Sequence, residues 1–178
     1  MGGSVFLVGM MGAGKTTLGK ALARKTGQEF IDTDKLLVER TGVPVATIFE
    51  IEGEEGFRRR ESALLREVAA RAPCVVATGG GAILAEENRQ TMRAAGTVIY
   101  LRARLDNLWE RLHHDSTRPL LATPDPRATL AALLEQRDPL YREAAHLVVD
   151  TGLQSASTLV NRVLAALRRH EEAVGRAP

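Results

Sequence analysis

Residues 9–16 read Gly-Met-Met-Gly-Ala-Gly-Lys-Thr, a spacing of glycines before a lysine and a hydroxyl that is typical of a phosphate-binding loop. The segment follows the apolar run of residues 5–8 and opens into a helical pattern that begins at Thr17. Such glycines let backbone N–H groups turn toward a polyphosphate, Lys15 can reach the β- and γ-phosphates, and the Thr16 hydroxyl can ligate Mg²⁺. The motif therefore predicts a nucleotide site. Its expected contacts are Gly12, Ala13, Gly14, Lys15, Thr16 and Thr17.

Two aspartates stand two residues apart at the end of the second apolar run, in Ile31-Asp32-Thr33-Asp34. On a strand that continued through them, both side chains would project to the same side. One carboxylate can hold a hydrated Mg²⁺ together with Thr16, while the other accepts a hydrogen bond from the hydroxyl that attacks the γ-phosphate. Either aspartate alone could instead cap the next helix, where this residue type is favoured.

Three consecutive glycines, Gly79, Gly80 and Gly81, follow Thr78 at the end of the third apolar run. Such a run costs backbone entropy and indicates a close approach of the chain to something, most simply a ligand that a Cβ atom would block. A tight turn between a strand and a helix is the alternative, because glycine is also a common turn residue.

Four arginines are candidates for contacts with ligands. Arg58 lies in a charged helical segment and Arg137 near the end of a helix, and the planar guanidinium fork can bind a carboxylate at two points. From residue type alone, each of these two is more typical of a solvated surface charge. Arg118 lies on a polar loop and could swing onto a transferring phosphoryl group, and Arg111 could stack on adenine.

The histidine pair and the cysteine give no metal site. His113 and His114 are adjacent, and adjacent helical positions do not share a face. Cys74 lies within an apolar run, so we expect a small buried side chain in a reducing compartment.

Short runs rich in β-branched residues recur at 4–8, 28–32, 74–78, 97–101 and 146–150, with longer helical patterns between them. Runs without clean polar alternation are typical of strands covered on both faces. The alternation predicts an α/β fold with a parallel sheet and a ligand site at the carboxyl ends of its strands.

Helix ends and domain limits are also readable. Asp125 before Pro126 suits a helix start, and Gly27 and Gly42 suit helix ends. The 178 residues fit one domain. Its expected parts are a core of about 4–170, a helical insertion of about 34–62, a polar lid of about 114–126 and a frayed tail of about 170–178.

The 24 basic and 22 acidic residues nearly balance, which predicts no general affinity for nucleic acid or membranes. No apolar stretch approaches the length of a membrane span. We therefore expect a soluble cytoplasmic protein. We also expect a monomer.

Taken in order, these motifs resemble the shikimate kinase family over residues 4–151. The motifs that carry the resemblance are Gly-x-x-Gly-x-Gly-Lys-Thr, Asp-Thr-Asp, Phe57-Arg58-Arg59, Gly-Gly-Gly, Arg-Pro-Leu-Leu and Arg-x-Pro-Leu-Tyr. The resemblance implies a P-loop fold of the nucleoside-monophosphate-kinase type with five parallel strands. It also implies transfer of the γ-phosphate of ATP to the 3-hydroxyl of shikimate, with Mg²⁺ as cofactor.

The resemblance assigns roles to individual residues. Asp34 would hold the reacting hydroxyl, and Arg58 and Arg137 would bind the carboxylate of the substrate. Gly79, Gly80 and Gly81 would contribute to the substrate site, Glu61 would orient Arg58, and Phe49 and Phe57 would form an apolar wall. Arg118 would be the lid residue and Arg111 would lie against adenine, while Thr16 and Asp32 would serve magnesium, Asp32 through water.

One departure concerns the adenine pocket, where members of the family often have a proline after the last strand. This chain reads Gly152-Leu153-Gln154-Ser155-Ala156, so one wall of that pocket has no assigned residue. A gluconate or nucleotide kinase is a second candidate, since both share the loop and the architecture. A GTP-dependent switch is a third, although its usual Asn-Lys-x-Asp string does not occur.

Overall fold

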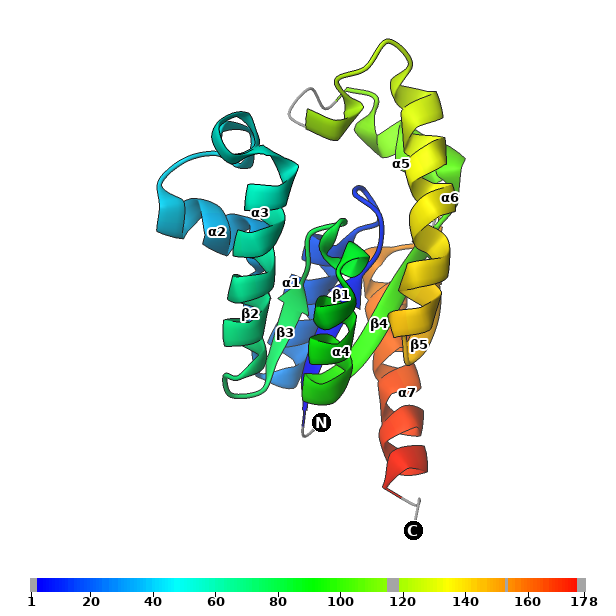
Figure 1. Ribbon diagram of the computed structural model, residues 1–178. Helices are drawn as coiled ribbons and strands as arrows, with labels where there is room; N and C mark the ends of the chain where they lie inside the picture. The colour runs from blue at the N-terminus through cyan, green and yellow to red at the C-terminus, as the bar shows by residue number, and fades with distance from the viewer. Residues whose placement is uncertain (1–2, 115–118, 153, 176–178) are drawn as a thin grey trace.

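The computed structural model describes residues 3–114, 119–152 and 154–175. Its sheet has five parallel strands in the order β2-β3-β1-β4-β5 (Figure 1). The strands are β1 Ser4–Val8, β2 Glu29–Asp32, β3 Cys74–Ala77, β4 Gly96–Ala103 and β5 Leu147–Thr151. Each lies where an apolar run predicted it, and β4 extends beyond its run at both ends. The predicted fold class is therefore confirmed.

Helices cover both faces of this sheet. They are α1 Lys15–Thr26, α2 Thr33–Thr41, α3 Val45–Ala69, α4 Glu86–Ala95, α5 Leu105–Leu112, α6 Pro126–Ala144 and α7 Ala156–Val174, with short 3₁₀ turns η1 Ala82–Leu84 and η2 Pro119–Leu121. Helices α1 and α7 pack together on one face, while α4 and α6 lie on the other (Figure 1). Within the described ranges, no helix combines the length and apolar character needed to cross a bilayer.

The expected helix ends are present. Asp125 caps α6, because its side chain accepts a hydrogen bond from the N–H of Ala128, and Pro126 occupies the first turn. Gly27 and Gly42 end α1 and α2 in the left-handed conformation, with φ angles of 70° and 71°.

Two boundaries differ from those expected. The helical insertion continues past residue 62, because α3 runs on to Ala69, with a break in helical geometry at Gly53. At the other end of the chain, α7 continues to Val174, so the helix extends into the segment expected to fray. The apolar face of α7 explains this, since Val160, Val163 and Leu167 are buried and hold the helix on the core.

The core centres on β1 and β3, whose residues are all buried. Cys74 is 1% exposed, and burial raises the pKa of its thiol above the ordinary value. The expectation of a small buried side chain is confirmed.

The strand order brings three chain segments to one edge. Strands β2, β3 and β1 are neighbours and parallel, so their carboxyl ends lie side by side. Asp32 ends β2, the three glycines follow β3, and the phosphate loop follows β1. Thr78, just after β3, connects the end of this strand to β1, because its N–H and its hydroxyl both donate to the carbonyl of Leu7, at 3.2 and 3.1 Å.

A histidine extends the pairing of β4 with β5. The N–H of His146 donates to the carbonyl of Val98 at 2.8 Å, and its ring Nδ1 accepts from the N–H of Val98 at 3.0 Å. Burial lowers the pKa of His146, and the nearby Arg93 and His170 lower it further. The folded protein therefore binds fewer protons here than the unfolded chain, whose histidine pKa is about 6.5.

We expect the free energy of unfolding to receive the full contribution of His146 above about pH 6.5 and to lose it as the pH falls through the lowered pKa. Urea unfolding at pH 7.5 and 5.5 measures this loss. In His146→Asn, Oδ1 can replace Nδ1 as the acceptor without titrating, so the variant should lose less stability on acidification. Equal losses in both proteins would contradict this role for His146.

Candidate active site

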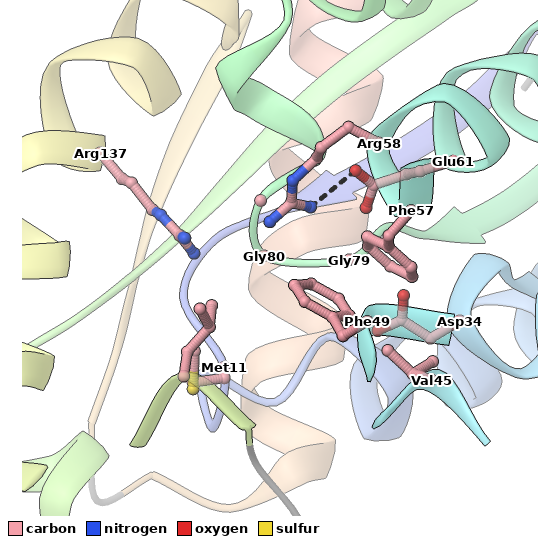
Figure 2. Close-up of a pocket in the computed structure, with 12 residues that line it drawn as sticks. Met11, Asp34, Val45, Phe49, Phe57, Arg58, Glu61, Gly79, Gly80 and Arg137 are labelled. Atoms are coloured by element: carbon pink, nitrogen blue, oxygen red, sulfur yellow. Dashed lines mark hydrogen bonds and ion pairs between the residues drawn. The ribbon is translucent and has the colours of Figure 1, made fainter. Parts of the chain in front are cut away.

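A cleft opens at the carboxyl ends of the strands, between the α2 and α3 side of the molecule and α6 (Figure 2). Every residue expected at the substrate site lines it: Asp34, Phe49, Phe57, Arg58, Glu61, Gly79, Gly80, Gly81 and Arg137. The structure adds Met11, Val45 and Leu120, which sequence reasoning missed. A signal existed for two of them, because Met11 occupies a variable position of the phosphate loop and Leu120 belongs to the Arg-Pro-Leu-Leu motif.

Arg137 reaches the cleft from α6 and is 2% exposed. Its Nε and Nη1 have no hydrogen-bond partner among the described residues. A solvated surface position, which residue type alone favoured, is therefore wrong for Arg137. A buried guanidinium with unused donors is well suited to bind an anion.

Arg58 faces Arg137 from the opposite side of the cleft, on α3 (Figure 2). Its Nη1 donates to Glu61 at 2.8 Å and its Nη2 to Glu54 at 3.2 Å. Burial lowers the pKa of Arg58, but the two carboxylates more than offset that effect and hold the pKa above its usual value. The predicted contact between Glu61 and Arg58 is confirmed, and Arg58 is not a solvated surface charge.

Glu61 is a buried carboxylate, 3% exposed. Burial raises its pKa above the ordinary value, and the positive charge of Arg58 offsets this effect in part. Asp34, also in the cleft, raises the pKa of Glu61 further by repulsion. The cleft thus carries two arginines close to two carboxylates.

The aromatic pair forms an apolar wall beside these charges. The rings of Phe49 and Phe57 lie 4.7 Å apart between centroids at a tilt of 34°. The guanidinium carbon of Arg58 lies 5.2 Å from the centre of the Phe57 ring.

The three glycines approach protein side chains closely. A Cβ on Gly79 would lie 2.6 Å from Glu61 Oε1 and 2.8 Å from Asp34 Oδ1, and a Cβ on Gly81 would overlap the guanidinium of Arg58. None of the three adopts a positive φ angle. The close approach predicted from the glycine run is present, and the side chains of the site itself account for it at Gly79 and Gly81.

The two aspartates differ from the strand geometry expected of them. Strand β2 ends at Asp32, which caps α2 by accepting the N–H of Lys35, and Asp34 lies in the first turn of that helix. The capping alternative is therefore correct for Asp32. The same residue also accepts the Thr16 hydroxyl at 2.7 Å, so it remains placed beside the phosphate loop.

The phosphate loop lines a second hollow that joins the cleft. Both hollows share Met11, Asp34 and Gly80. Gly12, Gly14, Lys15, Thr16, Thr17 and Asp32 line the loop side. Lys15 Nζ donates to the carbonyls of Gly9 and Met10 at 2.7 and 2.9 Å, so its ammonium lies over the loop. Asp34 thus stands at the junction between the two hollows.

A third hollow lies on the other side of the loop, beside Arg111. Nη1 of Arg111 donates to the carbonyl of Gly12 at 2.8 Å, and Nη2 to that of Gly152 at 3.4 Å. Residues on one wall are Gly12, Ala13, Gly14, Thr17 and Leu18, and on the other Thr151, Gly152, Gln154, Ala156 and Leu159. The second set begins at Thr151, the last residue of β5, and its other members follow that strand. This is the segment where the sequence placed the departure.

Arg118 lies outside the described residues. The lid residues on either side are described up to His114 and from Pro119, and Leu120 lines the cleft.

A sequence model of the shikimate kinase family matches residues 11–168 of this chain. The chain belongs to the shikimate kinase family. A shikimate kinase of Bordetella pertussis is 57% identical over 168 residues, which cover 94% of this chain and 80% of the relative. One of Chromobacterium violaceum is 54% identical over 164 residues, covering 92% and 89%.

Comparison with solved structures supports the same family. The shikimate kinase of Acinetobacter baumannii, described as a complex with shikimate, superposes with a TM-score of 0.92 at 42% identity, covering 94% of this chain and 93% of that one. A gluconokinase of Sinorhizobium meliloti has a TM-score of 0.66 at 24% identity, which shows a shared fold. Shikimate kinases are ATP-dependent kinases, and this chain is an enzyme of that kind.

A methyl group on the glycine loop should displace Arg58. In Gly81→Ala the new Cβ overlaps the guanidinium, so the bond to Glu61 should break and the pKa of Glu61 should rise further. NMR titration of Glu61 measures the change. Gly3→Ala, whose Cβ meets nothing within 4 Å, is the control and should leave Glu61 unchanged.

An unaltered pKa of Glu61 in Gly81→Ala would show that Arg58 keeps its place despite the methyl group. Affinity for ADP should stay near that of the wild type, because Gly81 lines neither the phosphate-loop hollow nor the hollow beside Arg111.

Proposed function

We propose that this cleft transfers the γ-phosphate of ATP to the 3-hydroxyl of shikimate, giving shikimate 3-phosphate and ADP in the synthesis of aromatic amino acids. The observation that carries the proposal is the buried Arg137, whose free donors face Arg58 across the cleft. Such a pair suits an acceptor with a carboxylate.

The acceptor half would hold a ring acid at two ends. Arg58 and Arg137 would bind the carboxylate, since guanidinium forks match its geometry. Glu61 would keep Arg58 oriented, and the Phe49 and Phe57 rings would contact the apolar face of the ring. Gly79, Gly80 and Gly81 would let the acceptor approach the backbone closely.

The donor half would hold ATP through the phosphate loop. Backbone N–H groups of the loop and the start of α1 favour phosphate oxygens, and Lys15 supplies a positive charge. Arg111 and Thr17 would lie on the base side. Gln154 and Leu159 would form the opposite wall there.

Magnesium fits beside the loop. The Thr16 hydroxyl donates a hydrogen bond to the carboxylate of Asp32, which leaves lone pairs on the hydroxyl oxygen for a cation. Thr16 would ligate Mg²⁺ directly and Asp32 through water. When bound, the ion would neutralise charge on the phosphate oxygens.

Asp34 stands where the donor and acceptor halves meet. In the proposed reaction the acceptor oxygen forms a bond to the γ-phosphorus, the bond from that phosphorus to the bridging oxygen of ADP breaks, and the hydroxyl proton passes to Asp34. Arg118 would close over the transferring group from the lid. Because phosphoryl transfer has a loose transition state, positioning and charge neutralisation should supply most of the catalysis.

A gluconate or nucleotide kinase remains the competing assignment. The gluconokinase likeness is at 24% identity and concerns the fold. A nucleotide acceptor would require a base pocket, whereas the acceptor side here carries two arginines and two phenylalanines. A GTP-dependent switch binds no small-molecule acceptor, so it would not require the acceptor side of the cleft.

The proposal includes one kinase domain with a helical insertion and a lid, working as a monomer in the cytoplasm. The buried thiol of Cys74, which forms no disulfide, supports a reducing compartment.

ADP release measured with shikimate, quinate, gluconate and nucleoside monophosphates tests the function directly. We expect turnover with shikimate to exceed that with each of the others. Preferred turnover of gluconate or of a nucleotide would overturn the proposal.

Asp34→Asn tests the role at the junction. Because an asparagine cannot take the hydroxyl proton, kcat should fall by about 10²- to 10⁴-fold, while KM for ATP stays close to that of the wild type. Steady-state kinetics separate the two constants. Asp106→Asn, on the surface of α5, is the matched control. A near-normal kcat in Asp34→Asn would remove this residue from the chemistry.

A further inference from the structure

The carbonyl groups of the glycine loop all have partners. The carbonyl of Gly79 accepts the N–H of Ala82, and that of Gly81 accepts the N–H of Leu84, each at 3.1 Å. Both are backbone bonds within the turn that follows β3. The carbonyl of Gly80 instead accepts the hydroxyl of Tyr141 at 2.6 Å, from a residue 61 positions later in the chain. Its partner can therefore be removed by substitution without changing the loop sequence.

The bond from Tyr141 restricts a peptide that its own residues leave free to rotate. A peptide between two glycines has no Cβ atom on either side to restrict its rotation. The carbonyl of Gly80 and the N–H of Gly81 belong to one planar trans peptide, so they point in opposite directions. While Tyr141 holds the carbonyl on the α6 side, the N–H is directed to the other side. Gly80 and Gly81 both line the cleft.

Tyr141 is itself firmly held. It is 0% exposed and stacks on Tyr100, with ring centroids 4.8 Å apart and an interplanar angle of 23°. Burial raises the pKa of Tyr141, and the neighbouring Arg137 offsets this only in part, so the hydroxyl stays protonated and can donate. Its oxygen also lies 3.7 Å from the sulfur of Met10.

Tyr141 lies one helical turn after Arg137, so both side chains lie on the same face of α6. One end of that face carries the buried arginine of the acceptor site, and the other end is bonded to the glycine loop. The tyrosine thereby sets the position of the loop relative to Arg137.

We propose that Tyr141 is a positioning residue for the acceptor: its hydroxyl fixes the Gly80–Gly81 peptide against α6 and keeps the glycine loop in register with Arg137. This role rests on the proposed function, which places Gly80 and Arg137 at the acceptor. Tyr141 does not line the cleft and touches no substrate in this scheme.

Tyr141→Phe removes the hydroxyl and keeps the ring stack. We expect KM for shikimate to rise about three- to tenfold with kcat nearly unchanged, because a displaced glycine loop would weaken binding of the ground state and of the transition state alike. KM for ATP should stay at the wild-type value, because the contact of the hydroxyl with the phosphate loop is a weak one to sulfur.

Tyr100→Phe is the matched control. It removes a hydroxyl from the same stack, but that hydroxyl donates to Asp138 at 2.7 Å, a residue outside the cleft lining. We expect normal KM values for both substrates. An equal rise in KM for shikimate in both variants would assign the effect to the aromatic stack and overturn the proposal. A normal KM for shikimate in Tyr141→Phe, together with a lowered melting temperature, would also overturn it, because the hydroxyl would then serve stability alone.

A second measurement needs no turnover. The ¹³C′ resonance of Gly80 reports on the hydrogen bond to its carbonyl oxygen, so it should move in Tyr141→Phe and stay in Tyr100→Phe. An unmoved resonance would show that Tyr141 does not fix this peptide. Failure of the wild type to phosphorylate shikimate would count against the proposed function alone, since the resonance tests the loop separately.

Discussion

The unbonded donors of a buried arginine govern the acceptor side of this molecule. Arg137 is 2% exposed, and two of its nitrogen atoms have no partner among the residues described. Leaving buried charged donors unsatisfied costs more than the about 1–3 kcal/mol typical of a neutral group. Glu61 bonds to Arg58 through Oε2, and its Oε1 has no partner among the described residues, so Glu61 does not satisfy Arg137. An anionic ligand would relieve this cost, and the cleft therefore favours an acceptor with a carboxylate.

The sheet explains why this charge lies next to the phosphate loop. Three parallel strands end side by side, and each delivers a different part: Asp32 at the end of β2, the glycines after β3 and the loop after β1. The glycine segment lies between the other two. Since it carries no side chains, it admits Asp34, Glu61 and Arg58 from helices on one side, and α6 approaches from the other.

Sequence predicted most of this arrangement, and the remainder depends on contacts between distant segments. The strands were predictable because buried β-branched runs mark them. The placement of Arg58 and Arg137 in the site was predicted from the motifs of the family, because residue type alone favours an exposed position. The position of Asp34 on a helix was missed, because Asp32 ends the strand and caps α2. The bond from Tyr141 to Gly80 spans 61 residues, and no local pattern encodes it.

The lack of side chains in the glycine loop has a further consequence. A loop that cannot fix itself must be held by its neighbours, and here they come from both halves of the cleft. The hydroxyl of Thr33 accepts the N–H of Gly79 at 3.2 Å, and Thr33 lies directly between the two aspartates. The hydroxyl of Tyr141 holds the other end, from the helix that carries Arg137. The loop therefore links α2, which carries Asp34, to α6, which carries Arg137. A displacement of either helix would change the distance between Asp34 and Arg137, so in the proposed reaction the alignment of the acceptor hydroxyl with the phosphate would depend on the hydroxyls of both Thr33 and Tyr141.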